Sequence, residues 1–590
     1  MSARLSLCLV AATTIGCHAV GPSTVTLTDL VVTQNGNGSV RSGTFNVHVK
    51  RPKNASGSSG IRLHQLAIND DPTSTSTVPI IVAHLTGDLP GDVDPGEEIV
   101  TSLGFELTDP QLLGFPPFDP CVAPGGFSLA GVYFDDAEQA FFPIRSEPTW
   151  FFSKPLTGIT WGTTVGDEHA QVGRGIAVFP DGSSALVGAT FDNESSAQTP
   201  LPGATPTPFL TRIDASGAIV WSHDAKLTTP DPLDSFTQGP SLVAAAPNGD
   251  IVVAGNLDGT LDLGNGTFAS AGATDVFLAR FDAAGKPLET KLWGDSLAQT
   301  VTTMDVDAAG DVILVGTLAG AMDFGSGPIA PLIDPAFTSF YVAKLAPSGA
   351  PVYARVPLVV ENAPDVFAAV GPEGTVALGG AYLGEAWFDG VPQQKSSIDT
   401  GLLIKLAADG AIAWSAAIEG ADVRQVAIDE GDVVAIVNVL DLPGKAVVGG
   451  KELLGGPWGK TFLTRFDPVG ALRYAIPLGG VGSFDHMTLV VDSAGHSLLS
   501  GAILQTLTLE GQEADPTRPS SFVKELDRNG ARVRSMAFGC AAPPMQLAVA
   551  RSGARDPVLL STFFGATDFG KGITRAAGGS DLLVAKLPAK

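Results

Sequence analysis

Four aspartates recur close before the glycine of a short repeated segment and are the first candidates for chemistry. They lie in LDLG, MDFG, WFDG and TDFG and are Asp262, Asp323, Asp389 and Asp568. A ring of equivalent carboxylates would bind cations or sugar hydroxyls. An aspartate close before a turn glycine also accepts hydrogen bonds from the backbone N–H groups of its own turn. We favour the turn role, because a feature shared by several repeats is more often a requirement of the fold than an active site.

Known motifs for catalysis or metal binding are not found in the sequence. The eight histidines show no HExxH or similar spacing, no cysteine pair has zinc spacing, and no G-x-S-x-G elbow, P-loop or dinucleotide fingerprint occurs in a strand–helix context. His486 and His496 flank one strand, and we expect a surface-loop role for them. The acids between Asp88 and Glu98 would suit Ca²⁺ but lack EF-hand spacing. The sequence therefore predicts no catalytic residue, no metal and no cofactor, and we do not expect an enzyme.

The elements around these residues repeat along three-quarters of the chain. An apolar stretch followed by a polar turn, such as FLTRFDPVG, occurs seven times, beginning at Phe209, Phe277, Tyr341, Leu402, Phe462, Phe522 and Leu583. A second motif, read as a hairpin, alternates with it and carries a turn glycine at Gly182, Gly249, Gly310, Gly374, Gly431, Gly495 and Gly553. Each period holds about four short strands and no helical periodicity, which is the content of one propeller blade. The sequence predicts an all-β chain with a seven-bladed β-propeller over residues 155–590.

The two ends of this array are complementary. The last copy, LVAKL, has no strand after it, whereas GITW at Gly158 stands unpaired before the first hairpin. We expect the two segments to complete one blade, which would hide the free sheet edges. Trp161, Trp221 and Trp414 occupy one repeated strand position, for which packing between blades is favoured over a sugar-stacking platform.

These repeats resemble the SBBP-type propeller repeats of large exported proteins from myxobacteria and similar bacteria. In that family, units of the form DxFVAKxDxxG alternate with DxxGNVYVxG. The resemblance covers residues 155–590 and implies a propeller in an exported protein, without implying an activity. The first repeat departs from the pattern at TPLPGATPTP, and the fifth departs at PGKAVVGG.

The N-terminus is typical of an export signal. Residues 1–16 contain Arg4 and a short apolar stretch, followed by Thr14-Ile15-Gly16-Cys17. The ending resembles a bacterial lipobox, which implies lipidation of Cys17 and a membrane anchor. His18 rather than aspartate after it implies the outer membrane or cell surface. The alternative is an ordinary signal cut near Ala19, with a periplasmic or secreted product.

Charge and cysteine content limit the partners. The net charge of −26, with 35 Lys and Arg, argues against nucleic acid, which needs a basic surface. If Cys17 is acylated, Cys121 and Cys540 either pair as a disulfide in an oxidising compartment or stay as two buried thiols.

Residues 17–150 lack the repeat and form a separate unit. Segments such as GTFNVHVKR and FSLAGVYFDD alternate apolar and polar residues at strand spacing. Six or seven such strands predict a small immunoglobulin-like β-sandwich.

The favoured function is a non-catalytic cell-surface lipoprotein whose propeller is a ligand-binding or scaffold module for a protein or glycan. The alternative is an exported propeller enzyme acting on polysaccharide as a lyase or glycosidase, which would need two convergent, non-repeated carboxylates. A third hypothesis is a structural spacer of the envelope. We expect any ligand at the longest irregular loops, Asp192–Pro208 and Thr228–Thr237.

Overall fold

The computed structural model describes residues 23–34, 40–69, 81–86, 89, 91–107, 128–146, 158–191, 206–229, 238–332, 337–362, 366–393, 395–441, 444–456, 460–478, 484–503, 508–509, 512–513, 520–539, 541–549, 556–563, 566–568 and 573–589. The chain is all-β, because every regular element in these ranges is a strand. No helix there is long and apolar enough for a membrane crossing. The chain divides into two compact units, one with strands β1 to β7 and one with β8 to β47.

The first unit is a set of seven strands with the hydrogen-bonded order β1-β2-β5-β4-β3-β6-β7. Its strands are β1 (Thr24–Gln34), β2 (Val40–Lys50), β3 (Ile61–Asn69), β4 (Ile81–Thr86), β5 (Glu98–Leu107), β6 (Ser128–Asp135) and β7 (Ala140–Arg145). Alternate residues of β2, among them Phe45 and Val47, are buried. The Phe45 ring packs against Phe105 of β5 with centroids 6.0 Å apart. The alternation predicted from the sequence thus gives one buried face.

The second unit contains seven groups of four antiparallel strands in its described part. Group 1 is β9 (Ala170–Val178), β10 (Ser184–Phe191), β11 (Pro206–Ile213) and β12 (Ile219–Asp224). Group 2 is β14 (Gly239–Ala245), β15 (Ile251–Leu257), β18 (Asp275–Phe281) and β19 (Pro287–Trp293). Group 3 is β20 (Gln299–Val306), β21 (Val312–Leu318), β24 (Thr338–Leu345) and β25 (Pro351–Asn362). Group 4 is β26 (Val366–Val370), β27 (Val376–Phe388), β29 (Ser396–Leu406) and β30 (Ile412–Glu419).

The remaining groups follow the same pattern. Group 5 is β31 (Ala421–Asp429), β32 (Asp432–Val439), β35 (Lys460–Phe466) and β36 (Leu472–Pro477). Group 6 is β37 (Phe484–Val491), β38 (Ser497–Ile503), β41 (Ser520–Leu526) and β42 (Arg532–Gly539). Group 7 is β43 (Ala541–Ala548), β44 (Val558–Phe563), β47 (Asp581–Lys586) and β8 (Trp161–Val165). Groups 3, 4 and 5 are joined by further pairing of β25 with β27 and of β29 with β31.

Short strands lie between the second and third strands of several groups, and one more, β13, lies between groups 1 and 2. They are β13 (Lys226–Thr228), β16 (Thr260–Asp262), β17 (Thr267–Ala269), β22 (Met322–Asp323), β23 (Pro328–Ile329), β28 (Val391–Pro392), β33 (Lys445–Val448), β34 (Lys451–Leu454), β39 (Thr508–Leu509), β40 (Gln512–Glu513), β45 (Ala566–Asp568) and β46 (Ile573–Arg575). Most form two-stranded hairpins, whereas β13 adds to the β16–β17 hairpin and β28 pairs with β27. They correspond to the weaker repeated signature that contains Asp262 and Asp323.

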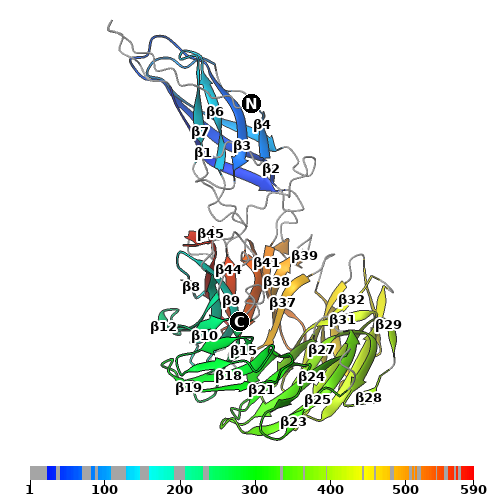
Figure 1. Cartoon of the computed structure of the whole chain (residues 1–590). Coiled ribbons are helices and arrows are strands. Elements are labelled where there is room, and N and C mark those ends of the chain that lie inside the picture. The colour runs from blue at the N-terminus through cyan, green and yellow to red at the C-terminus, as the bar shows by residue number, and fades with distance from the viewer. Residues whose placement is uncertain are drawn as a thin grey trace, which may run out of the picture. The chain divides into compact units, whose positions relative to one another are not determined.

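Group 7 combines the two ends of the second unit. Strand β8 pairs with β47 in the register Leu582↔Val165 to Lys586↔Trp161. Figure 1 shows teal β8 beside the red C-terminal strands. The expected pairing of the Trp161 segment with the final repeat is confirmed.

The first strands of the groups contact one another in sequence order. These strands, here called the inner strands, are β9, β14, β20, β26, β31, β37 and β43. Strand β43 in turn contacts β9, so the contacts return to their start. The strands next to them are mostly apolar because neighbours cover both faces, as in Val312–Leu318 of β21, where all but one residue are buried.

Two of the turns in each group lie at the same end of that group. Because neighbouring strands are antiparallel, the turn between the first and second strands and the turn between the third and fourth emerge at the same end. We call this end the turn face. The described glycines of the second repeated motif all have positive φ there, namely Gly182, Gly249, Gly310, Gly374, Gly431 and Gly495.

Candidate functional site

The seven inner strands surround one cavity of about 440 Å³. Its walls are mostly valine, alanine, leucine and isoleucine, and its polar side chains include Thr303, Asp305 and Gln425. It extends to the turn face, where Pro180 and Pro247 belong to its lining. The cavity is therefore an apolar space with a few polar groups at defined positions, which is the general form of a ligand site.

Six of the seven inner strands carry a shift in register at about the same level beside this cavity. Four of these shifts each skip one residue of the inner strand in the pairing register, and those residues are Arg174, Ser241, Thr302 and Arg424. Arg174 donates to the backbone oxygen of Gln238, and burial lowers its pKa to about 10. Such bulges redirect side chains and are frequent next to binding sites.

The aspartates predicted from the repeat lie in separate hairpins. Asp262 Oδ1 accepts a hydrogen bond from Gly264 N at 2.8 Å, and Asp323 Oδ1 accepts from Gly325 N and Gly327 N at 2.7 and 3.0 Å. Both carboxylates thus serve their own turns. Asp389 has φ 50° and forms an ion pair with Arg355 instead.

The other predicted residues are placed only in part. Asp568 ends strand β45, and its side chain lies outside the described residues, as do Cys17, Cys121 and Cys540. Most of the two irregular loops expected to hold a ligand also lies outside. In the acidic segment of the first unit, Glu97 accepts from Asp94 N at 2.8 Å and Glu98 pairs with Lys50 at 3.1 Å.

The repeated tryptophans connect neighbouring groups. The indole N–H of Trp161 in group 7 donates to Ala215 O in a turn of group 1 at 2.9 Å. Trp221 of group 1 donates to Ala283 O of group 2, and Trp414 of group 4 donates to Pro468 O of group 5, both at 3.2 Å. These contacts give the three tryptophans a packing role between groups.

A ring of buried charges, which the sequence reasoning missed, lies next to the turn face. In each group the last but one residue of the core third-strand motif is charged, and these residues are Arg212, Arg280, Lys344, Lys405, Arg465, Glu525 and Lys586. None is more than 8% exposed. The sequence contains a sign of this ring, because each repeat has one charged residue just before its last apolar residue, such as the Arg in FLTRF and the Lys in YVAKL. Six are basic, and Glu525 of group 6 is the exception.

Most described partners of the basic residues are acids of the first turn. In group 3, Lys344 Nζ lies 2.9 Å from Asp307 and 3.1 Å from Asp311. Burial disfavours the charged lysine, but hydrogen bonds and charge from the two aspartates outweigh it and raise the pKa of Lys344. The buried cation is therefore neutralised within its own group.

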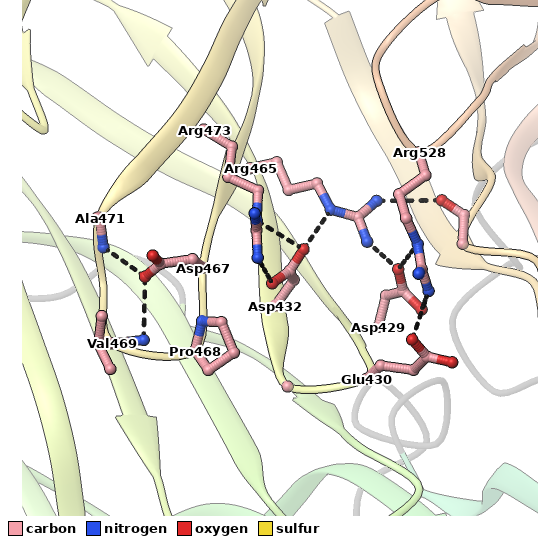
Figure 2. Close-up of polar contacts among 12 residues, drawn as sticks. Asp429, Glu430, Asp432, Arg465, Asp467, Pro468, Val469, Ala471, Arg473 and Arg528 are labelled. Atoms are coloured by element: carbon pink, nitrogen blue, oxygen red, sulfur yellow. Dashed lines mark hydrogen bonds and ion pairs between the residues drawn. The ribbon is translucent and has the colours of Figure 1, made fainter.

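Group 5 has the most extensive of these networks (Figure 2). Fully buried Arg465 donates to Asp432 through Nε at 2.8 Å and also pairs with Asp429. Arg473 binds the same Asp432 at 3.1 Å, and Arg528 of group 6 binds Asp429 at 3.1 Å. Burial lowers the pKa of Arg465. Figure 2 shows both aspartates lying between two guanidinium groups, so the network joins groups 5 and 6.

Group 6 reverses the charges at the same place. Glu525 stands where group 5 has Arg465, and His496 follows the turn glycine where group 5 has Asp432. His496 Nδ1 lies 2.8 Å from Glu525 Oε1 and 3.6 Å from Asp492 Oδ2. Arg534 Nε donates to Glu525 Oε2 at 2.6 Å. His496 lies in the turn, as expected, but its side chain is 17% exposed and contacts these carboxylates.

Two buried carboxylates lie at the opposite end of third strands. Asp275 begins β18 and Asp581 begins β47, and they are 1% and 3% exposed. Asp275 accepts a backbone hydrogen bond from Ala271 N at 2.6 Å, and Asp581 accepts one from Ala577 N at 3.0 Å and another from Gly578. Burial raises the pKa of both carboxyl groups.

Comparison with known proteins identifies no family. No protein-family model matches the chain, and no curated protein matches it. Among solved structures, hydrazine synthase of Kuenenia stuttgartiensis is 11% identical over 71% of this chain and 98% of its own, with a TM-score of 0.37. The Hadza microbial sialidase Hz136 is 12% identical over 96% of each chain, with a TM-score of 0.37. A mutant puromycin hydrolase is 13% identical over 76% of this chain and 60% of its own, with a TM-score of 0.34. Likeness at this level carries no argument about function.

Proposed function

We propose that this chain is an exported, non-catalytic surface protein whose second unit is a seven-bladed β-propeller acting as a ligand-binding or scaffold module for a protein or glycan. The observation that carries the proposal is the cavity of about 440 Å³ to which all seven inner strands contribute. Its volume falls within the roughly 300–1,000 Å³ typical of ligand pockets.

The architecture in this proposal follows from strand order and contacts. Each of the seven groups is one blade, and group 7 is the blade made from both ends of the repeat array. In the first unit, the runs β1-β2-β5-β4 and β3-β6-β7 correspond to the two sheets of an immunoglobulin-like sandwich. A lipid on Cys17 would attach the chain to the outer membrane or cell surface.

Repeated and non-repeated residues have different tasks in this proposal. The repeated charges and tryptophans serve contacts within and between groups, as the Arg465 and Trp161 contacts illustrate. The non-repeated Thr303, Asp305 and Gln425 are our candidates for contacts with the ligand, because they are polar residues in a mostly apolar wall, whereas the lining residue Asp307 pairs with Lys344. The bulges beside the cavity support the same location.

Binding is tested with the purified mature chain on arrays of bacterial glycans and with peptides from envelope proteins. Thr303→Trp fills the cavity and should reduce binding of any hit by at least tenfold. Thr228→Trp, at an exposed position of β13, is the matched control and should bind as the unaltered chain does. Equal loss in both variants, or full binding by Thr303→Trp, contradicts a cavity site. Cleavage of a polysaccharide by the chain would favour the alternative, a lyase or glycosidase.

The anchor is tested separately in the native host. Mass spectrometry of the mature N-terminus should show an acylated Cys17 in the outer-membrane fraction, and Cys17→Ala should move the protein out of that fraction. An unmodified N-terminus in the periplasm or medium would contradict the anchor without bearing on the cavity.

A further inference from the structure

The reversed charges of group 6 place two carboxylates where other groups hold a cation. In groups 3 and 5, the first aspartate of the turn, Asp307 or Asp429, contacts the basic residue of the third strand. Group 6 keeps that aspartate as Asp492, but its third strand supplies Glu525. Arg534 already pairs with Glu525 Oε2, and a positive charge between Asp492 and Glu525 Oε1 would further reduce the repulsion between the two buried carboxylates.

We propose that Asp492, His496 and Glu525 bind a divalent transition-metal ion of the Zn²⁺ class. Each residue offers one ligand atom, and the three atoms lie within 4.8 Å of one another. Imidazole nitrogen with carboxylate oxygen is a donor set that zinc accepts. Three protein ligands leave a fourth tetrahedral position for water, and the 17% exposure of the His496 side chain gives access from solvent.

The distances fit such an ion with small adjustments. Ligand atoms at about 2.1 Å from a tetrahedral zinc lie roughly 3.4 Å apart. His496 Nδ1 and Asp492 Oδ2 are 3.6 Å apart, close to that spacing. His496 Nδ1 and Glu525 Oε1, at 2.8 Å, are within hydrogen-bond distance and would separate slightly around the ion.

The surrounding contacts hold the carboxylates in place. Asp492 Oδ1 accepts backbone hydrogen bonds from Ala494 N and His496 N at 2.9 and 2.8 Å. Arg534 holds Glu525 Oε2 at 2.6 Å, so the other oxygen of Glu525 faces His496. Ligand carboxylates in metal sites are commonly oriented by such outer hydrogen bonds.

The proposal is tested on the purified untagged mature chain, stripped with EDTA and dialysed. Zn²⁺ is titrated by calorimetry, and Co²⁺ binding is followed by visible absorption, which reports the coordination geometry. We expect one metal equivalent that depends on group 6. The key variant is His496→Asp with Glu525→Arg, which rebuilds the Asp–Arg pair of group 5 and so retains the fold. It should bind Zn²⁺ at least about 100-fold more weakly than the unaltered chain at this site.

Two further results decide between a metal and a simple ion pair. Cysteine thiolates are zinc ligands in general, so only the equivalent lost in the double variant counts. His496→Gln is the second variant, in case the double variant fails to fold, and should lose the same equivalent. The proposal is overturned, leaving a His496–Glu525 ion pair, if the unaltered chain binds no metal or if both variants bind as much Zn²⁺ as the unaltered chain does.

Discussion

Groups 5 and 6 are neighbours with the same strand order, yet they neutralise their buried charge in opposite ways. Group 5 puts the cation on the third strand, as Arg465, and the acids Asp429 and Asp432 on the turn. Group 6 puts the acid on the third strand, as Glu525, and His496 on the turn. In these two groups the buried charge has an opposite charge beside it, whichever strand supplies each one.

The two solutions differ in what they depend on. A guanidinium stays protonated at physiological pH, so group 5 always carries its positive charge. Imidazole can donate a hydrogen bond, carry a proton or bind a metal. The reversal thus replaces a permanent cation with an imidazole that has these three options. For this reason we place the proposed metal ion in group 6 and not in group 5.

The largest effect is expected from breaking the network of group 5. Arg465→Ala leaves Asp429 and Asp432 buried at 5% and 10% side-chain exposure without their shared partner. We expect the free energy of unfolding of the second unit to fall by about 3–5 kcal/mol. All seven tryptophans lie at or beyond residue 150, so urea unfolding followed by tryptophan fluorescence reports this unit.

The control for that experiment is Arg473→Ala. Arg473 binds Asp432 as well, but its side chain is 51% exposed. An exposed ion pair contributes below about 1 kcal/mol. Similar losses in both variants would mean that burial does not set the importance of the contact, contrary to the comparison above.

A double-mutant cycle in group 6 tests the reversal itself. In EDTA, Glu525→Arg alone sets a second guanidinium beside Arg534 and should destabilise the unit by about 1–2 kcal/mol. Adding His496→Asp supplies the missing acid and should recover part of that loss, with a coupling energy of about 0.5–3 kcal/mol. A coupling energy near zero would show that position 496 does not contact position 525 in the way the structure has it.

The sequence predicts the repeated parts of this molecule well. Seven copies of two motifs correspond to the seven groups, and the unpaired GITW and LVAKL segments meet as β8 and β47. Local rules suffice there, because turn glycines and apolar runs act over a few residues. The own-turn contacts of Asp262 and Asp323 are of this local kind.

The charge network needs the structure, because its partners are distant in sequence. Arg465 is more than thirty residues from Asp429 and Asp432, as Glu525 is from Asp492. Asp389 lies in the same repeated segment, one residue closer to its glycine, and contacts Arg355 of another strand, which no local rule indicates. Spacing rules for metal motifs do not cover the proposed set, because Asp492 and His496 lie in a turn and Glu525 lies on β41, 29 residues beyond His496.

The smallest effect is expected at Asp275, a buried carboxylate without a cation beside it. Its charged neighbours are acidic, unlike those of the buried charges in groups 5 and 6. Burial, followed by the charges of Asp295 and Asp258, raises the pKa of Asp275. The carboxyl group of Asp275 therefore binds a proton more readily in the folded state than in the unfolded chain. Its contribution to stability is present below the unfolded value of about 3.9 and is lost as pH rises through the raised value.

Asp275→Asn should remove that dependence. The amide oxygen can still accept from Ala271 N, while the buried negative charge is gone. We expect the variant to be more stable than the unaltered chain by about 1 kcal/mol at pH 7, with the difference shrinking toward pH 4. The matched control is Asp295→Asn, because hydrogen bonds lower the pKa of Asp295, first among them the one from Leu297 N at 2.8 Å. That variant should lose stability at pH 7, and a gain of stability in both variants would show that general acidity, rather than burial, governs these carboxylates.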